Sequence, residues 1–120
     1  MILIDTSVWI DHLRSADQRV IDQLERTNVL MHPFVLGEIA CGNLSNNRRA
    51  ILQLLSHLPF APVATDKEVL RFIDRHVLMG KGIGYVDAHL LASVTLTGSA
   101  RIWTRDKRLA AIAKGLDLAV

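Results

Sequence analysis

Four acidic residues occupy positions where a carboxylate needs an explanation. Asp5 ends an apolar run at the start of the chain, and Asp106 follows a short apolar run near its end. Glu38 and Asp87 lie among apolar residues at helical spacing. Each has an ordinary structural explanation, since Asp often caps a helix and Glu can pair with a surface Arg. The four together indicate a shared acidic site.

A cluster of carboxylates is suited to binding divalent cations. Carboxylates that lie close together repel one another, and buried ones are costly, unless cations neutralise them. Oxygen ligands without His or Cys favour Mg²⁺ or Mn²⁺ over zinc, and the single cysteine, Cys41, cannot build a cysteine-rich zinc site. Such oxygen sites hydrolyse phosphodiester bonds, because one cation activates water and a second stabilises the leaving oxygen.

The elements that must position these acids follow an alternating pattern. Short runs of β-favouring apolar residues alternate with segments of helical period, which is typical of an α/β fold with a mainly parallel sheet. The predicted strands cover residues 1–4, 29–31, 60–63, 101–104 and 116–120. The predicted helices cover residues 7–14, 17–26, 34–41, 46–58, 65–79, 85–96 and 106–114.

Residues at the helix ends support several of these boundaries. Thr65 and Glu68 are spaced as a capping box that starts the fifth predicted helix. Asn46 or Asn47 is the predicted cap of the fourth helix, and Gly115 is predicted to end the last one.

This predicted topology brings the four acids to one place. In an open α/β sheet, ligands bind in the crevice beyond the carboxyl ends of the strands. Asp5 and Asp106 both follow strands and should open onto that edge, while Glu38 and Asp87 should point inward from helices. Glu38 is therefore expected to be buried, where its carboxylate needs a cation, a hydrogen-bond partner or a proton.

Length and composition indicate one globular unit. The 120 residues suit a single domain, residues 1–120, and half are hydrophobic, which is enough for one well-packed core. The chain start lacks the basic region of a signal peptide, and no uncharged apolar segment approaches the roughly 18 residues of a membrane span. A lone cysteine suits a reducing compartment. We expect a soluble, cytoplasmic protein without membrane contact.

The distribution of charge is more informative than its net value. The chain has 14 basic and 12 acidic residues, and setting the four acids aside leaves eight acidic residues against 14 basic ones. A mildly basic surface around an acidic site is compatible with a polyanion held near bound cations, or with an ordinary solvated surface. The basic residues that flank the acid-bearing elements, and are the predicted phosphate contacts, are Arg14, Arg105, Lys107 and Arg108.

Four short motifs carry a family resemblance. They are IDTS at residues 4–7, Glu38, YVDA at residues 85–88 and WTRD at residues 103–106. In this order, and almost from end to end of the chain, they resemble the PIN domain, and most closely the VapC toxins of bacterial type II toxin–antitoxin systems. The resemblance implies a three-layer α/β/α fold with a parallel sheet of order 3-2-1-4-5. It also implies Mg²⁺- or Mn²⁺-dependent cleavage of RNA, a homodimer, and inhibition by a cognate VapB-type antitoxin.

The resemblance also assigns roles to individual residues. The positions that match the acids of the family are Asp5, Glu38 and Asp87, with Asp106 at the fourth, more variable position. Thr6 and Thr104 match hydroxyl residues that can hydrogen-bond a carboxylate or a water on the metal. Arg105 stands where a smaller residue is frequent in the family.

Two other interpretations compete with this one. A phospho-acceptor receiver domain also binds Mg²⁺, but it resembles a chain with paired acids after its first strand and an Asp after its third, and only Asp5 is in place here. A catalytically silent PIN domain that only binds RNA or a partner would have lost a core acid, and all are present. The five histidines show no metal-ligand spacing, so packing or surface roles are expected for them. The sequence does not identify the RNA.

Overall fold

A short parallel sheet forms the centre of the molecule. The structure is a computed structural model and describes residues 1–44 and 47–120. Its strands are β1 (Ile2–Ile4), β2 (Val29–Leu30) and β3 (Arg101–Trp103), in the order β2-β1-β3, with both neighbours parallel to β1. β1, which directly precedes Asp5, is therefore the central strand, as expected from the sequence. The sheet and its helices confirm an α/β fold.

The two outer strands predicted from the sequence are reduced to single bridges. Segments 60–63 and 116–120 each make one parallel bridge, Phe60 with Met31 and Ala119 with Ile102. Pro59 precedes the first segment and Pro62 lies within it, and a proline has no N–H to donate to a β-ladder, which explains why pairing does not extend. The bridges lie outside β2 and β3, but the five-strand order 3-2-1-4-5 remains a prediction.

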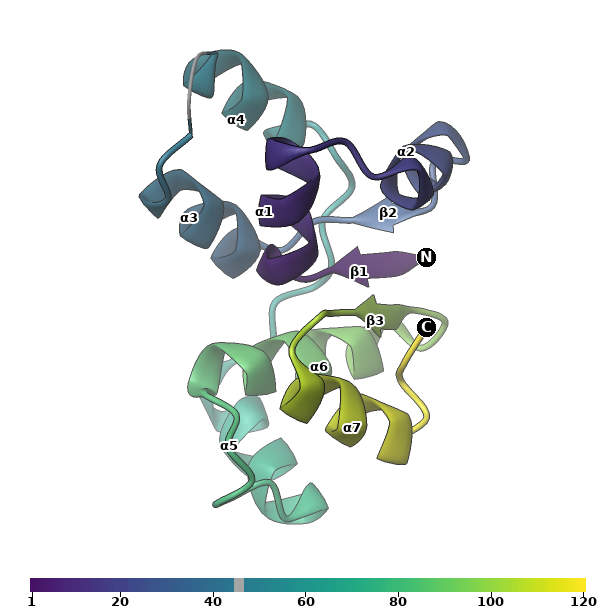
Figure 1. Cartoon of the computed structure of the whole chain (residues 1–120). Helices are drawn as coiled ribbons and strands as arrows, with labels where there is room; N and C mark the ends of the chain where they lie inside the picture. The colour runs from purple at the N-terminus through teal and green to yellow at the C-terminus, as the bar shows by residue number, and fades with distance from the viewer. Residues whose placement is uncertain (45–46) are drawn as a thin grey trace.

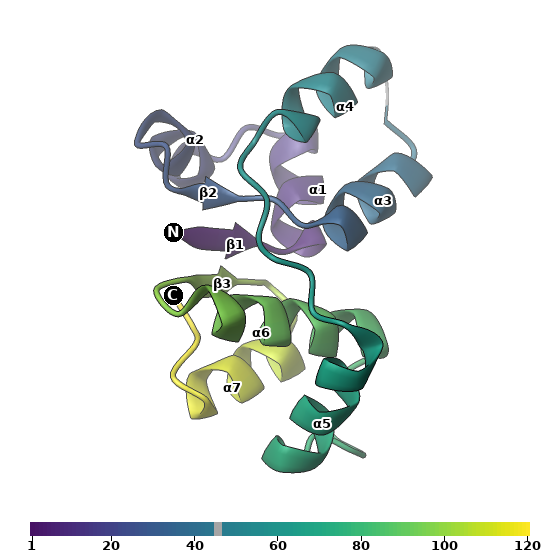
Figure 2. The same ribbon diagram turned by 180° about the vertical axis from the view of Figure 1, so that it is seen from behind.

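Helices cover both faces of this sheet. They are α1 (Thr6–Arg14), α2 (Gln18–Glu25), α3 (Pro33–Cys41), α4 (Arg48–Ser56), α5 (Asp66–His76), α6 (Tyr85–Thr97) and α7 (Lys107–Gly115). Each predicted helix is therefore present, with small shifts at its ends. α1 and α7 lie toward the viewer in Figure 1, and α6 lies toward the viewer in the reverse view of Figure 2.

The predicted caps are only partly correct. The capping box is confirmed: Thr65 Oγ1 accepts from the Glu68 N–H at 3.1 Å, and Glu68 Oε1 accepts from the Thr65 N–H at 2.9 Å. Asn47 does precede α4, but its backbone is left-handed with φ of 70° and its side chain makes no capping hydrogen bond. The alternative cap, Asn46, lies outside the described residues.

The end of α7 differs from the prediction. Gly115 does not stop the helix but is its last residue, and the left-handed turn falls at Asp117, whose φ is 58°. The Leu118 N–H then donates to the Ala113 carbonyl at 2.8 Å, which satisfies a terminal carbonyl of α7. Asp tolerates this conformation better than most residues other than glycine, so the turn forms two residues late.

The core explains why α6 is so apolar. The helix buries seven consecutive residues, 88–94, because it packs against both β3 and α5. Its first turn, which carries Asp87, is less buried. A rigid apolar helix therefore presents an acid at its exposed end. In the parts of the chain that the structure describes, none of the helices combines the length and apolar character needed to traverse a bilayer.

Candidate active site

Asp5 lies at the carboxyl end of β1 and is held by hydroxyl groups. Its side chain is 7% exposed, and its Oδ2 accepts from Thr104 Oγ1 at 2.7 Å and from Ser7 Oγ at 2.9 Å. Although Asp5 precedes α1, its side chain does not cap that helix. Helix capping therefore does not explain this acid.

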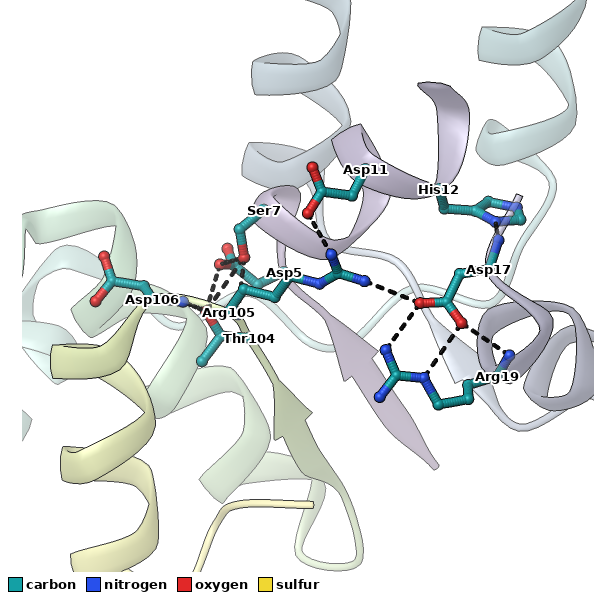
Figure 3. A network of polar contacts seen from close by, with 9 residues as sticks. All are labelled: Asp5, Ser7, Asp11, His12, Asp17, Arg19, Thr104, Arg105 and Asp106. Atoms are coloured by element: carbon teal, nitrogen blue, oxygen red, sulfur yellow. Dashed lines mark hydrogen bonds and ion pairs between the residues drawn. The ribbon is translucent and has the colours of Figure 1, made fainter. Parts of the chain in front are cut away.

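The two hydroxyl groups also tie down the loop between β3 and α7. Thr104 Oγ1 accepts from the Asp106 N–H at 3.0 Å, and Ser7 Oγ accepts from the Arg105 N–H at 3.0 Å. Each hydroxyl thus accepts from the loop and donates to Asp5, as Figure 3 shows. Thr104 makes the predicted contact with a carboxylate. Ser7 was missed by the sequence reasoning, and its only signal was a hydroxyl group two residues after the acid.

Asp106 caps α7 with one of its two oxygens. Oδ1 accepts from the N–H groups of Arg108 and Leu109 at 2.9 and 3.0 Å. Within the described residues, Oδ2 makes no hydrogen bond, and the side chain is exposed. The capping interpretation is therefore correct for Asp106, but it leaves one oxygen available to a ligand.

Glu38 differs most from its prediction, because it is exposed rather than buried. The buried residues of α3 are Val35 and Ile39, one turn apart, and Glu38 lies beside that stripe rather than on it. Its Oε1 accepts from Thr6 Oγ1 at 2.7 Å, the contact with a carboxylate predicted for Thr6. Both residues line an open groove of about 670 Å³ that also includes Phe34 and Val86.

Asp87 lies within electrostatic range of the other three acids. It is half-buried in the first turn of α6, and Gly84 donates its N–H to Oδ2 at 3.3 Å. Burial raises the pKa of this carboxyl, the Gly84 N–H opposes that rise, and the charges of Asp5, Asp106 and Glu38 raise the pKa further. Three carboxylates from three other segments of the chain therefore act on the carboxyl of Asp87.

The donor set fits a divalent cation in charge and ligand type. Its donor atoms are all carboxylate oxygens, and a cation would offset the repulsion that the other three acids exert on Asp87. Within residues 1–44 and 47–120, no three His, Cys, Asp or Glu side chains converge into a ready-made cage for a metal ion. Mg²⁺ is commonly bound through one or two carboxylates, with water and substrate phosphates completing its shell. The site fits that open mode rather than a closed cage.

The predicted phosphate contacts separate into three groups. Lys107 and Arg108 are exposed in the first turn of α7, next to Asp106. Arg14 is exposed at the far end of α1, about 12 Å along the helix axis from Thr6. The Arg105 guanidinium forms ion pairs with two carboxylates of its own chain. Of the four, Lys107 and Arg108 are exposed beside Asp106 and form no ion pair with another residue that the structure describes.

His32 has the packing role that the sequence predicted for the histidines. It is fully buried, its Nδ1 accepts from the Phe34 N–H at 3.0 Å at the start of α3, and its Nε2 lies 3.1 Å from Ser93 Oγ. Burial, with a smaller contribution from His89, lowers its pKa to about 4. A ring that stays neutral and satisfied in this way is part of the core rather than of the acidic site.

Comparison with known proteins identifies the family. The PIN domain matches residues 2–115 of the chain. Two curated relatives, both named ribonuclease VapC32, come from Mycobacterium tuberculosis strains CDC 1551 / Oshkosh and ATCC 25618 / H37Rv. Each is 52% identical to this chain over 111 residues, which cover 92% of this chain and 89% of the relative. The chain therefore belongs to the PIN-domain family, among the VapC ribonucleases.

Proposed function

We propose that this protein is the toxin of a type II toxin–antitoxin system and cleaves RNA phosphodiester bonds with the help of Mg²⁺ or Mn²⁺. The residues proposed to hold the cation are Asp5, Glu38, Asp87 and Asp106. The relatives' name, ribonuclease VapC32, supports the RNA-cleaving activity. Residues 1–120 are proposed to form a single PIN domain that acts as a homodimer and is inhibited by a VapB-type antitoxin.

The surroundings of Asp87 support the proposed site: burial raises the pKa of this half-buried carboxyl, and the charges of Asp5, Asp106 and Glu38 raise it further. Acids on the surface of a protein are ordinarily dispersed, because like charges at short range destabilise the fold. Here one acid follows β1, one lies on α3, one lies on α6 and one directly precedes α7. A bound cation turns this repulsion into attraction, which gives the arrangement a physical reason.

The chain's own residues have distinct tasks in this proposal. Ser7 and Thr104 donate to the same oxygen of Asp5, so the other oxygen keeps a fixed direction. Thr6 orients Glu38, which is otherwise exposed. When bound, a divalent cation in such a site activates water for attack on the phosphodiester and stabilises the leaving oxygen.

The proposed RNA contacts lie on α7. Lys107 and Arg108 are exposed beside Asp106 and can neutralise the phosphates that flank the scissile bond. The open groove lined by Thr6, Glu38 and Phe34 includes one of the four acids, and we propose that an unpaired nucleotide binds there. Single-stranded or looped RNA is the form that fits such a surface.

A cleavage assay with matched variants tests the proposal. Purified protein is incubated with a mixture of cellular RNA in the presence of Mg²⁺ or Mn²⁺. Asp5→Asn should abolish cleavage, while Asp74→Asn, which removes an exposed acid from α5, should leave the cleavage rate unchanged. Binding of RNA without cleavage by the unmutated protein would favour the silent PIN domain instead.

The toxin role needs a separate test in cells. Induced expression of the chain should arrest growth, and co-expression of a VapB-type antitoxin should relieve the arrest. Asp5→Asn should be harmless at equal protein levels. Normal growth with the unmutated chain, combined with RNA cleavage in vitro, would contradict the toxin role and leave the nuclease activity standing.

A further inference from the structure

Arg105 links the loop between β3 and α7 to a distant part of the chain. Its guanidinium lies between the carboxylates of Asp11 on α1 and Asp17 at the start of α2, as Figure 3 shows. Nη1 donates to Asp11, and Nη2 donates to Asp17 Oδ2 at 2.9 Å. The Arg105 N–H donates to Ser7 Oγ, so both ends of this residue are attached to the N-terminal segment.

The carboxylate of Asp17, which pairs with this guanidinium, is held in place by Arg19 and is ionised. Its side chain is 13% exposed, and Arg19 binds it through its side chain at 3.0 Å and through its N–H at 2.9 Å. The side-chain and backbone hydrogen bonds from Arg19 are the main causes that lower the pKa of Asp17 to about 2, and Arg105 adds a smaller effect. Asp17 is thus ionised throughout the working range of pH.

The charges in this network are balanced. Asp11 and Asp17 contribute two negative charges, and Arg19 and Arg105 contribute two positive ones. A phosphate that recruited Arg105 would have to displace two carboxylates and leave both short of a partner. The Arg19 guanidinium is occupied further, since it lies 5.3 Å from the ring centroid of Trp103. The network therefore offers little free positive charge to RNA.

We infer that Arg105 is a positioning residue, which fixes the loop between β3 and α7 so that Thr104 contacts Asp5 and holds the backbone of Asp106. Arg105 lies between Thr104 and Asp106, and β3 ends at Trp103. Without its ion pairs, the loop would be held to the N-terminal segment mainly by single hydroxyl groups. The inference rests on the proposed function for the role of the two acids, and it replaces the expectation that Arg105 contacts phosphate.

The chemistry of Arg and Lys provides a discriminating substitution. A planar guanidinium can bind two carboxylates at once in fixed directions, whereas a Lys ammonium is a point charge on a flexible stem. Arg105→Lys should therefore fail to restore positioning. The same substitution would largely preserve a contact with phosphate, because phosphate binding by Lys is common.

The experiment compares Arg105→Lys and Asp17→Asn with a control, Arg101→Lys. Arg101 lies at the opposite end of β3 and is also ion-paired, with Asp117 at 3.4 Å. In calorimetric titrations with Mn²⁺, the two network variants should bind roughly 10–100-fold more weakly than the unmutated protein, as for other groups that support a ligand. In cleavage assays kcat should fall while KM is unchanged. Arg101→Lys should move none of these values.

RNA binding without metal distinguishes the two explanations, because only a phosphate contact predicts a change in affinity. If Arg105 positions the loop, both network variants bind RNA as the unmutated protein does, with the same salt dependence. If Arg105 contacts phosphate, Arg105→Ala weakens binding and lowers the slope of log K against log salt by about one. In that case Asp17→Asn should free the guanidinium and tighten binding. Either of these last two results would overturn the inference.

Hydrogen exchange separates this inference from the proposed function. The Asp106 N–H donates to Thr104 Oγ1, and its protection in metal-free protein should fall in folded Arg105→Lys but not in Arg101→Lys. Unchanged protection, or unchanged affinity for Mn²⁺, in Arg105→Lys would overturn the positioning role alone. Failure of the unmutated protein to bind Mn²⁺ would instead refute the proposed function, while the exchange measurement would still decide whether Arg105 holds the loop.

Discussion

Asp106 offers a substitution series that separates stability from function. Its Oδ1 accepts two backbone N–H groups of α7, so Asp106→Ala should lose the cap, at about 1 kcal/mol of the free energy of unfolding. For a chain of 120 residues, the usual entropy of unfolding converts about 1 kcal/mol into a fall of about 4 °C in melting temperature. Asp106→Asn keeps a capping oxygen and should stay within about 0.5 kcal/mol of the unmutated protein.

The functional effect should follow charge rather than capping. Asp106→Asn removes the negative oxygen that is left over from the cap, so affinity for Mn²⁺ and the rate of RNA cleavage should both fall. The fall should be at least as large as the roughly 10–100-fold typical of groups that only support a ligand. Thermal melting, Mn²⁺ titration and cleavage are measured on both variants. Normal cleavage and normal Mn²⁺ affinity in Asp106→Asn would show that this residue is a cap only.

Three further predictions follow from other contacts. Burial and the charges of Asp5, Asp106 and Glu38 raise the pKa of Asp87, so its ionised carboxylate destabilises the metal-free fold. Asp87→Asn should therefore raise the melting temperature of metal-free protein at neutral pH. A lower melting temperature would refute the repulsion between Asp87 and the other acids. Folding lowers the pKa of Asp17 from 3.8 to about 2, so the stability that Asp17 contributes is present above pH 3.8 and is lost as pH falls toward 2. Between these two pH values, the melting temperature of Asp17→Asn should fall less steeply than that of the unmutated protein. Thr6→Val should weaken Mn²⁺ binding because it removes the hydrogen bond that orients Glu38, whereas Thr6→Ser keeps the hydroxyl and should not. Equal effects of the two substitutions would exclude this hydrogen bond as the cause.

Local patterns predicted the parts of the fold that local interactions determine. The capping box at Thr65 lies within four residues of sequence, and the continuous apolar run of α6 follows from packing on both sides. The predicted strand over residues 60–63 is reduced to one bridge because Pro59 precedes it and Pro62 lies within it, and neither can donate an N–H to the ladder.

The sequence predicted the contacts of Thr6 and Thr104 with carboxylates, but not the exposure of Glu38 or the partners of Ser7 and Arg105. Glu38 has apolar neighbours in sequence, yet it lies beside the buried stripe of a short helix and is exposed. The hydrogen bond from the Arg105 N–H to Ser7 spans 98 residues, and the ion pair to Asp17 spans 88. No spacing rule relates residues so far apart in the chain, so these partners became visible only with the fold.

Cleavage of RNA by metal-depleted protein tests the proposed metal site most directly. The protein is stripped with EDTA, transferred to metal-free buffer, and assayed for RNA cleavage before and after titration with Mn²⁺ or Mg²⁺. We expect no cleavage without cation, recovery on addition of either cation, and no recovery in Asp5→Asn or Asp87→Asn. Undiminished cleavage after exhaustive chelation would contradict a catalytic role for a divalent cation at these four carboxylates.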